Sequence, residues 1–229
     1  MVLVVPATLH AENLIFNSSY SPPYTTDDHD GILEEILREA CRRAGHRASF
    51  RNLPAERALL DAESGVSDGV VARIDGMEGM YPSLVMVPSA TIPSRDFVAF
   101  SREALPRIRA WEDLAPYNIA YVRGWKIIEN SIPDAESALA LASTQRAFML
   151  LARDRTDVVI NARLDGLVMA DRLGIEDVQV HEPPLASVSL YPYLHRRHVD
   201  IVPDLAAALE AMKADGTFQR IYETAMSAY

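Results

Sequence analysis

Short apolar runs alternate with segments of helical periodicity along this chain, and this alternation restricts the fold more than any other feature. Apolar runs at 13–17, 48–50 and 69–72 are separated by helical patterns at 31–44 and 54–63. Strand–helix–strand–helix–strand order is typical of a parallel sheet covered by helices. The first part of the chain therefore predicts an α/β layer structure.

The ends of the first two helices carry recognisable signals. Asp30 is the expected N-cap of the first helix, and Gly45 is the residue expected just past its end. Pro54 suits the first turn of the second helix. The first helix has one apolar face, made of Ile32, Leu33, Ile36, Leu37, Ala40, Cys41 and Ala44.

The same alternation resumes after a proline-containing junction at 105–116. Strands are predicted at 97–100, 118–122, 157–160, 178–180 and 186–194, and helices at 139–152 and 162–173. Two helices end the chain, the first opened by Pro203 and the two separated by Asp215 and Gly216.

This order predicts a chain that leaves a first lobe and later returns to it. Residues 12–103 and 187–229 form the first lobe, and residues 104–186 form the second. The crossings, at 101–105 and 183–187, are expected to act as hinges because prolines flank both. Such a geometry leaves a cleft between the lobes, where ligands commonly bind.

Composition indicates a globular protein and argues against polyanionic partners. The 229 residues are 49% apolar and 24% charged, with 22 basic and 32 acidic side chains and a net charge of −10. Nucleic acids and anionic membranes both require a basic face, so neither is an expected partner. The single cysteine, Cys41, is expected in the core. Residues 1–11 are interpreted as the remnant of a signal peptide, with an ordinary N-terminal strand as the alternative.

Arg73 ends the third predicted strand, directly after the buried run 69–72. In an open α/β sheet, ligands lie beyond the carboxyl ends of the strands. The donor fork of arginine matches the oxygens of a carboxylate or phosphate. The alternative is a structural ion pair with a nearby acid.

Aromatic side chains also follow predicted strand ends. Tyr20, Tyr24 and Trp125 lie in such loops, where rings can stack on flat or cationic parts of a ligand. Arg57 is placed on the second helix, where it could project towards the cleft or form a surface ion pair with Glu56 or Asp61.

Several motifs, in this order, resemble the bacterial extracellular solute-binding proteins of family 3. They are Ser21-Pro22-Pro23-Tyr24, Gly31-Ile32-Leu33, Asp68-Gly69, Phe100-Ser101, Trp111-Glu112-Asp113-Leu114, Tyr121-Val122-Arg123-Gly124, Asp157-Val158-Val159 and Val202-Pro203-Asp204-Leu205. The resemblance covers about Asn13 to Tyr229. It implies the two-lobed type II periplasmic binding fold of ABC amino-acid importers, with a mostly parallel sheet and flanking helices in each lobe.

The chain departs from this family at both of its amino-acid clamps. The family's carboxylate-binding arginine falls on Ser94, and Arg95 comes one residue later, which in a regular strand turns it to the opposite face. The family's ammonium-binding aspartate falls on Ala162, beside Asn161. Arg73 either replaces the missing cation or fills the pocket. Simple α-amino acids are therefore expected to bind weakly, unless Asp28 or Asp165 substitutes for the missing acid.

Together these features predict a periplasmic receptor that captures a small carboxylate or other small anion for a membrane ABC permease. We expect a monomer without enzymatic activity or cofactor, since no catalytic constellation is recognised in the sequence. A metal is not expected either, because His195 and His198 lie beside two arginines that repel cations. The alternatives are a dehydratase-like enzyme on the same fold and the ligand-sensing module of a signalling receptor. The candidate ligand-binding residues are Arg73, Tyr20, Tyr24, Arg57, Ser94, Trp125 and Asn161.

Overall fold

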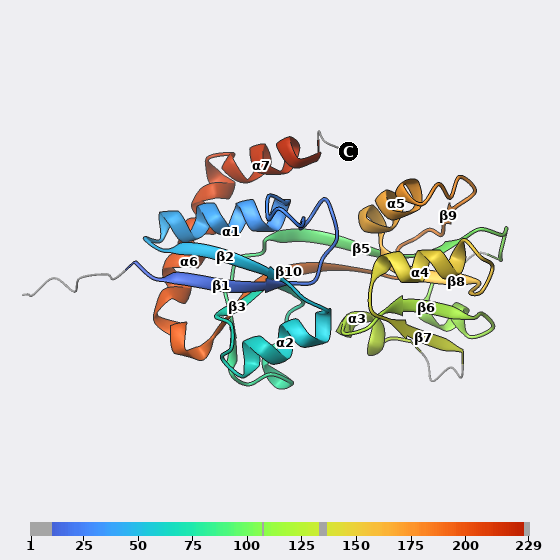
Figure 1. The fold of residues 1–229 in the computed structure, drawn as a ribbon, viewed down its shortest axis with the longest axis horizontal. Coiled ribbons are helices and arrows are strands. Elements are labelled where there is room, and N and C mark those ends of the chain that lie inside the picture. Colours follow the sequence, from blue (N-terminus) through green and yellow to red (C-terminus); the bar gives the residue numbers. More distant parts are fainter. Residues whose placement is uncertain (1–10, 107, 133–136, 227–229) are drawn as a thin grey trace, which may run out of the picture.

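A computed structural model describes residues 11–106, 108–132 and 137–226, and shows two lobes side by side along the long axis (Figure 1). Residues 1–10, which hold nearly all of the proposed signal remnant, lie outside the described residues. Ten strands form one sheet, of which eight follow the order β2-β1-β3-β10-β5-β8-β6-β7, while β4 pairs with β10 and β9 with β5.

The strands are β1 Asn13–Ser18, β2 Arg47–Asn52, β3 Gly69–Arg73, β4 Leu84–Met86, β5 Ile92–Ser101, β6 Ile119–Val122, β7 Ala138–Leu141, β8 Val158–Ala162, β9 Gln179–Val180 and β10 Ala186–His195. The α-helices are α1 Ile32–Arg43, α2 Ala55–Glu63, α3 Lys126–Glu129, α4 Thr144–Leu151, α5 Arg163–Arg172, α6 Val202–Ala214 and α7 Thr217–Met226. Short 3-10 turns occupy Met77–Gly79, Trp111–Leu114 and Arg196–Ile201.

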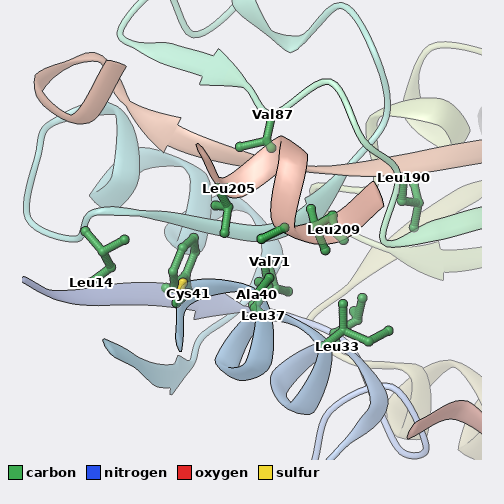
Figure 2. Close-up of a cluster of buried hydrophobic side chains, with 14 of the residues drawn as sticks. Leu14, Leu33, Leu37, Ala40, Cys41, Val71, Val87, Leu190, Leu205 and Leu209 are labelled. Carbon is green, nitrogen blue, oxygen red and sulfur yellow. The ribbon is translucent and has the colours of Figure 1, made fainter. Parts of the chain in front are cut away.

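The first lobe has the predicted parallel arrangement, in which β1 pairs with both β2 and β3. Its core lies between the sheet and α1 and α6, as Figure 2 shows. Leu37 and Cys41 of α1 are fully buried there, together with Leu205 and Leu209 of α6. The apolar face predicted for the first helix therefore packs on the sheet, and Cys41 is a buried free thiol.

The N-terminus of α1 is capped differently from the prediction. Gly31, not Asp30, is the N-cap, and the Glu34 carboxylate accepts hydrogen bonds from the N–H groups of Gly31 and Thr26 at 3.0 and 3.1 Å. A Cβ at Gly31 would lie 2.6 Å from Thr25 Cα, so this close approach requires glycine. Asp30 instead pairs with the Thr26 hydroxyl.

In the second lobe, β6 pairs in parallel with β7 and β8, and β8 runs antiparallel to β5. The helix predicted at 139–152 is wrong in its first part, because residues 138–141 form β7. Helix α4 begins only after Ser143, whose hydroxyl accepts from the N–H of Arg146 at 3.3 Å. Alanine and leucine fit both structures, and pairing with β6 selects the strand.

Strands β5 and β10 connect the two lobes. They pair antiparallel with each other from Ile92 opposite Leu190 to Phe97 opposite Ala186. Beyond this stretch β5 pairs with β8 and β9, while β10 pairs with β3 and β4. The first crossing therefore precedes the predicted 101–105 segment, and the second begins within the predicted 183–187 segment.

Both crossing strands contain irregularities. Between Ile92 and Arg95, β5 has one residue more than the facing stretch of β10, which is a β-bulge. A second register shift lies between Tyr191 and Tyr193 of β10, opposite β3. Each shift changes which face of the sheet the following side chains occupy.

Candidate functional site

The lobes meet where the loop after β6 touches the N-terminus of α2, and Figure 1 shows α2 and α3 side by side. Gly124 has a φ of +83°, and a Cβ there would lie 2.6 Å from the backbone nitrogen of Glu56. Next to it, Lys126 Nζ forms an ion pair with Glu56 Oε2 at 2.9 Å. The described arrangement of the lobes is therefore closed, with backbone against backbone.

A cavity of about 30 Å³ remains between the lobes. It holds roughly one water molecule, so a solute cannot occupy it unless the lobes or side chains move. Its walls are mostly apolar or aromatic and are formed by Tyr20, Arg73, Ile74, Met77, Phe97, Gly124, Trp125, Lys126, Ile127 and Leu190.

A second, polar hollow of about 360 Å³ opens between the lobes at the N-terminus of α4. Ser19, Asn52, Ser143 and Thr144 are among the residues that line it. Tyr20 lines both spaces, so this hollow lies beside the smaller cavity.

Arg73 lies at this cavity, as expected for a residue at the end of β3, and is 7% exposed. Its Nη1 donates to the Ala72 carbonyl at 2.7 Å, and its Nη2 to Ser19 Oγ and the Ala55 carbonyl at 3.1 and 3.3 Å. Its Nε has no hydrogen-bond partner. Among the described residues, no carboxylate pairs with it within 4 Å, so the ion-pair alternative is not found.

A second buried arginine, Arg95, was not a predicted site residue. Its Nη2 donates to Asp165 Oδ2 at 2.7 Å, and the two side chains are 1% and 0% exposed. Ser94, which the sequence placed at the ligand, is instead exposed. The bulge between Ile92 and Arg95 adds a residue to β5, so Arg95 lies on the same face as Ile92, which a regular strand counted from Ile92 would give to Ser94.

The three predicted aromatic residues gather around Arg95. Its Cζ lies 4.5 Å from the ring centroid of Tyr24, 4.6 Å from that of Tyr20 and 5.2 Å from that of Trp125. The Tyr20 hydroxyl donates to the Ala72 carbonyl at 2.7 Å, and Trp125 meets Phe97 edge to face with centroids 5.6 Å apart. Burial raises the pKa of Tyr24, and Arg95 acts against that rise.

Asp165 lies in the first turn of α5, just after Ala162, the buried N-cap. Burial raises the pKa of Asp165, and the Arg95 guanidinium opposes this. The acid considered as a substitute for the missing family aspartate is therefore present at the site, but it is already paired. An acid in the first turn of a helix is a sequence signal that could have placed it there.

Four predicted residues do not line the small cavity: Tyr24 and Ser94, described above, and Arg57 and Asn161. Arg57 projects from α2 into solvent, with its side chain 65% exposed, and pairs with Asp61 at 2.6 Å, so the surface alternative is the one found. Asn161 is fully buried in β8, where its Nδ2 donates to Thr144 Oγ1 at 3.3 Å and its Oδ1 lacks a partner. It joins β8 to the start of α4 and does not line the small cavity.

Of the two histidines at the C-terminal end of β10, His198 is held by acids, whereas His195 Nδ1 accepts from the N–H of Arg197. His198 lies 2.7 Å from Asp68 and 3.1 Å from Glu12. Over residues 11–106, 108–132 and 137–226, no group of three or more His, Cys, Asp or Glu side chains has an arrangement suited to a metal. None of the helices in these ranges has the length and apolar character needed to span a membrane.

No protein-family model matches the chain. An uncharacterized protein of Shewanella oneidensis is 26% identical over 205 residues, which cover 86% of this chain and 76% of that protein.

Solved structures resemble the chain over nearly its whole length. A histidine kinase sensor domain with similarity to periplasmic binding proteins has a TM-score of 0.80 at 15% identity, covering 93% of this chain and 95% of that one. The arginine-, lysine-, histidine-binding protein of Geobacillus stearothermophilus has a TM-score of 0.77 at 16% identity, with 93% and 94% covered. The GluR0 ligand-binding core of Nostoc punctiforme, in complex with L-glutamate, has a TM-score of 0.75 at 18% identity, covering 92% of this chain and 98% of that one. The chain has the two-lobed fold of type II periplasmic binding proteins, as predicted.

Proposed function

We propose that this protein is a periplasmic receptor that captures a small organic anion between its lobes and delivers it to an ABC permease. The observation that carries the proposal is the Arg73 guanidinium, which is buried at the interlobe cavity and has no carboxylate partner within the part of the chain that the structure describes. A buried, uncompensated charge costs several kcal/mol. A ligand carboxylate would offset this cost and accept from the unpartnered Nε.

The other charged groups near the cavity are already paired. Lys126 is held by Glu56 and Glu129, each at 2.9 Å, and Arg95 is held by Asp165. Among the described residues that line the cavity, Arg73 is therefore the cation without a carboxylate partner.

The cavity walls favour a ligand with an apolar body. Ile74, Met77, Phe97, Ile127 and Leu190 present hydrocarbon surface beside the Arg73 guanidinium. Burial of apolar ligand surface against such walls contributes roughly 25 cal/mol per Å². We infer a carboxylate that carries an aliphatic or aromatic group, with Tyr20 or Trp125 available for stacking.

An α-amino acid suits this site less well. Its ammonium would need Asp165, which is fully buried and engaged by Arg95, while Ala162 offers only a methyl group. Taking Asp165 from Arg95 would leave a second guanidinium without a partner. An acid of the same shape without the ammonium avoids that cost.

Matched pairs of α-hydroxy and α-amino acids test the proposal, because the members of a pair differ mainly in the charged nitrogen. We expect phenyllactate and 2-hydroxyisocaproate to raise the melting temperature of the protein, and phenylalanine and leucine to raise it much less. Stabilisation by a plain amino acid at sub-millimolar concentration would overturn the proposed ligand class. No stabilisation by any organic acid in a broad panel would overturn the receptor.

Solute entry requires the lobes to separate, since the cavity is too small in the closed form. We propose that the two lobes move against each other and that β5 and β10 bend where they pair, from Ile92 to Phe97 and from Ala186 to Leu190, so that the boundary in β5 falls before the predicted residue 103. The solute would then favour the closed form by the difference between its affinities for the two forms.

A sensory role is the second candidate, because a histidine kinase sensor domain is among the similar structures, with a TM-score of 0.80. The site and its ligand would be the same, and only the partner differs. Deletion of the gene distinguishes the roles. Loss of uptake of the stabilising acid indicates transport, whereas unchanged uptake with altered transcription in response to that acid indicates sensing.

A further inference from the structure

Arg95 is enclosed in the way that a bound cation is enclosed by a receptor. Tyr20 and Tyr24 come from the loop after β1 in the first lobe, and Trp125 and Asp165 come from the second lobe. Three ring centroids lie within 5.2 Å of the guanidinium carbon, and the carboxylate lies 2.7 Å from Nη2. Aromatic faces and a carboxylate are the groups that recognise a guanidinium away from water.

Arg95 is fully enclosed, but the hydrogen bonds between it and Asp165 are incomplete. Arg95 Nε and Nη1 and Asp165 Oδ1 are buried and have no partner. A guanidinium that approaches a carboxylate freely forms two parallel hydrogen bonds, whereas this pair forms one. Because Arg95 is attached to the backbone of β5, its guanidinium does not reach the position that would form both hydrogen bonds with the carboxylate.

Arg73 provides an internal contrast. Its guanidinium is held by two backbone carbonyls and a serine hydroxyl, and its Cζ lies 5.7 Å from the Tyr20 ring. These groups leave its charge available to a ligand, while the surroundings of Arg95 neutralise and cover the charge.

We propose that Tyr20, Tyr24, Trp125 and Asp165 form a guanidinium-binding site, and that the chain fills this site with its own Arg95. The resident side chain acts as an internal ligand, so the lobes are held together without a solute. The guanidinium site goes beyond the proposed anion receptor, because its ligand is a cation and its position is next to Arg73. The proposal does not depend on which anion Arg73 binds.

Removal of the internal ligand should make the site available to a free guanidinium. We expect Arg95→Ala to be less stable than the wild type, and methylguanidinium at low millimolar concentration to raise its melting temperature with saturation and a stoichiometry of one. Urea, which is planar and neutral, should have no such effect, and methylammonium should bind at least about tenfold more weakly because it lacks the donor fork.

Matched variants show whether the rings and Asp165 are what binds methylguanidinium. Arg102 also pairs with acids, Asp154 and Asp177, but no ring contact with it is found among the described residues. Arg102→Ala should therefore gain no saturable response to methylguanidinium. Arg95→Ala combined with Asp165→Ala should lose the response. A folded Arg95→Ala that does not bind methylguanidinium overturns the proposal.

The wild-type protein gives a second test that does not depend on the variant folding. After unfolding, dialysis and refolding to remove bound solutes, its small-angle scattering should match the curve calculated from the closed structure. A larger radius of gyration, falling to the closed value only when a stabilising acid is added, would show that Arg95 does not hold the lobes together. That result would leave the anion receptor itself intact.

Discussion

Two buried arginines lie at the junction of the lobes, and they differ in what surrounds them. Arg73, at the end of β3, meets carbonyl and hydroxyl oxygens of its own lobe and borders the cavity. Arg95, at the bulge of β5, meets a carboxylate and three rings that come from both lobes.

The difference shows that burial alone does not indicate the role of a charged side chain. Partial negative charges on carbonyl oxygens can hold a guanidinium in place without neutralising it, so it still attracts an anion. A carboxylate neutralises the guanidinium, and its removal then becomes costly. Arg73 is thus suited to binding a ligand, and Arg95 to holding the structure.

The largest expected effect comes from Asp165→Asn, which leaves the Arg95 guanidinium buried without its counter-charge. We expect a loss of about 3–5 kcal/mol in the free energy of unfolding, measured by urea titration. Asp177→Asn, which removes an exposed partner of Arg102, is the control and should change stability far less. Equal effects of the two substitutions would mean that the Arg95 pair does not have the structural role assigned to it.

Arg73→Ala tests whether Arg73 binds the ligand. We expect the affinity for a stabilising organic acid to fall by roughly 2–5 kcal/mol in calorimetry, because the charge that offsets the carboxylate is lost from a desolvated site. Arg57→Ala is the matched control, since Arg57 is exposed and lies on α2 away from the cavity. Unchanged affinity of Arg73→Ala would remove Arg73 from the ligand site.

A smaller effect should follow from Gly124→Ala, which separates the lobes beside Arg73. The substitution costs about 1–3 kcal/mol of backbone strain at positive φ. In addition, its Cβ would lie 2.6 Å from the Glu56 nitrogen, so the lobes must part and the radius of gyration should increase.

Gly174→Ala separates these two causes. Gly174 has a φ of +65°, but a Cβ there meets nothing within 4 Å, so it carries the strain without the clash. Its scattering curve should match that of the wild type. If both variants scatter alike, contact at Gly124 does not set the distance between the lobes.

The sequence was a good guide wherever a local pattern determined the structure. The apolar stripe of α1 and the run before Arg73 led to the correct helix and strand, and the positions of Tyr20, Tyr24 and Trp125 after strand ends led to the junction of the lobes. Periodicity and strand ends depend on neighbouring residues, which are visible in the sequence.

The failures occurred where a distant partner decided the outcome. Residues 138–141 form a strand because β6 lies beside them, and the bulge between Ile92 and Arg95 depends on the pairing of β5 with β10. Neither partner is near in sequence, so counting positions from Phe100 selected Ser94 instead of Arg95. For Arg57, helix periodicity alone left two directions open, and the structure has the surface ion pair with Asp61.

The continuous pairing of β10 has a mechanical consequence for the whole molecule. The strand belongs to both lobes, so rotation of one lobe must bend a single hydrogen-bonded ribbon and cannot simply swing on a loose linker. The register shift between Tyr191 and Tyr193 includes Pro192, which has no N–H to donate. This interruption lies against β3, inside the first lobe, whereas the stretch from Ala186 to Leu190 that pairs with β5 keeps its donors. If the lobes open as proposed, we expect the bending to fall on the β5–β10 pairing, which must deform as one two-stranded ribbon.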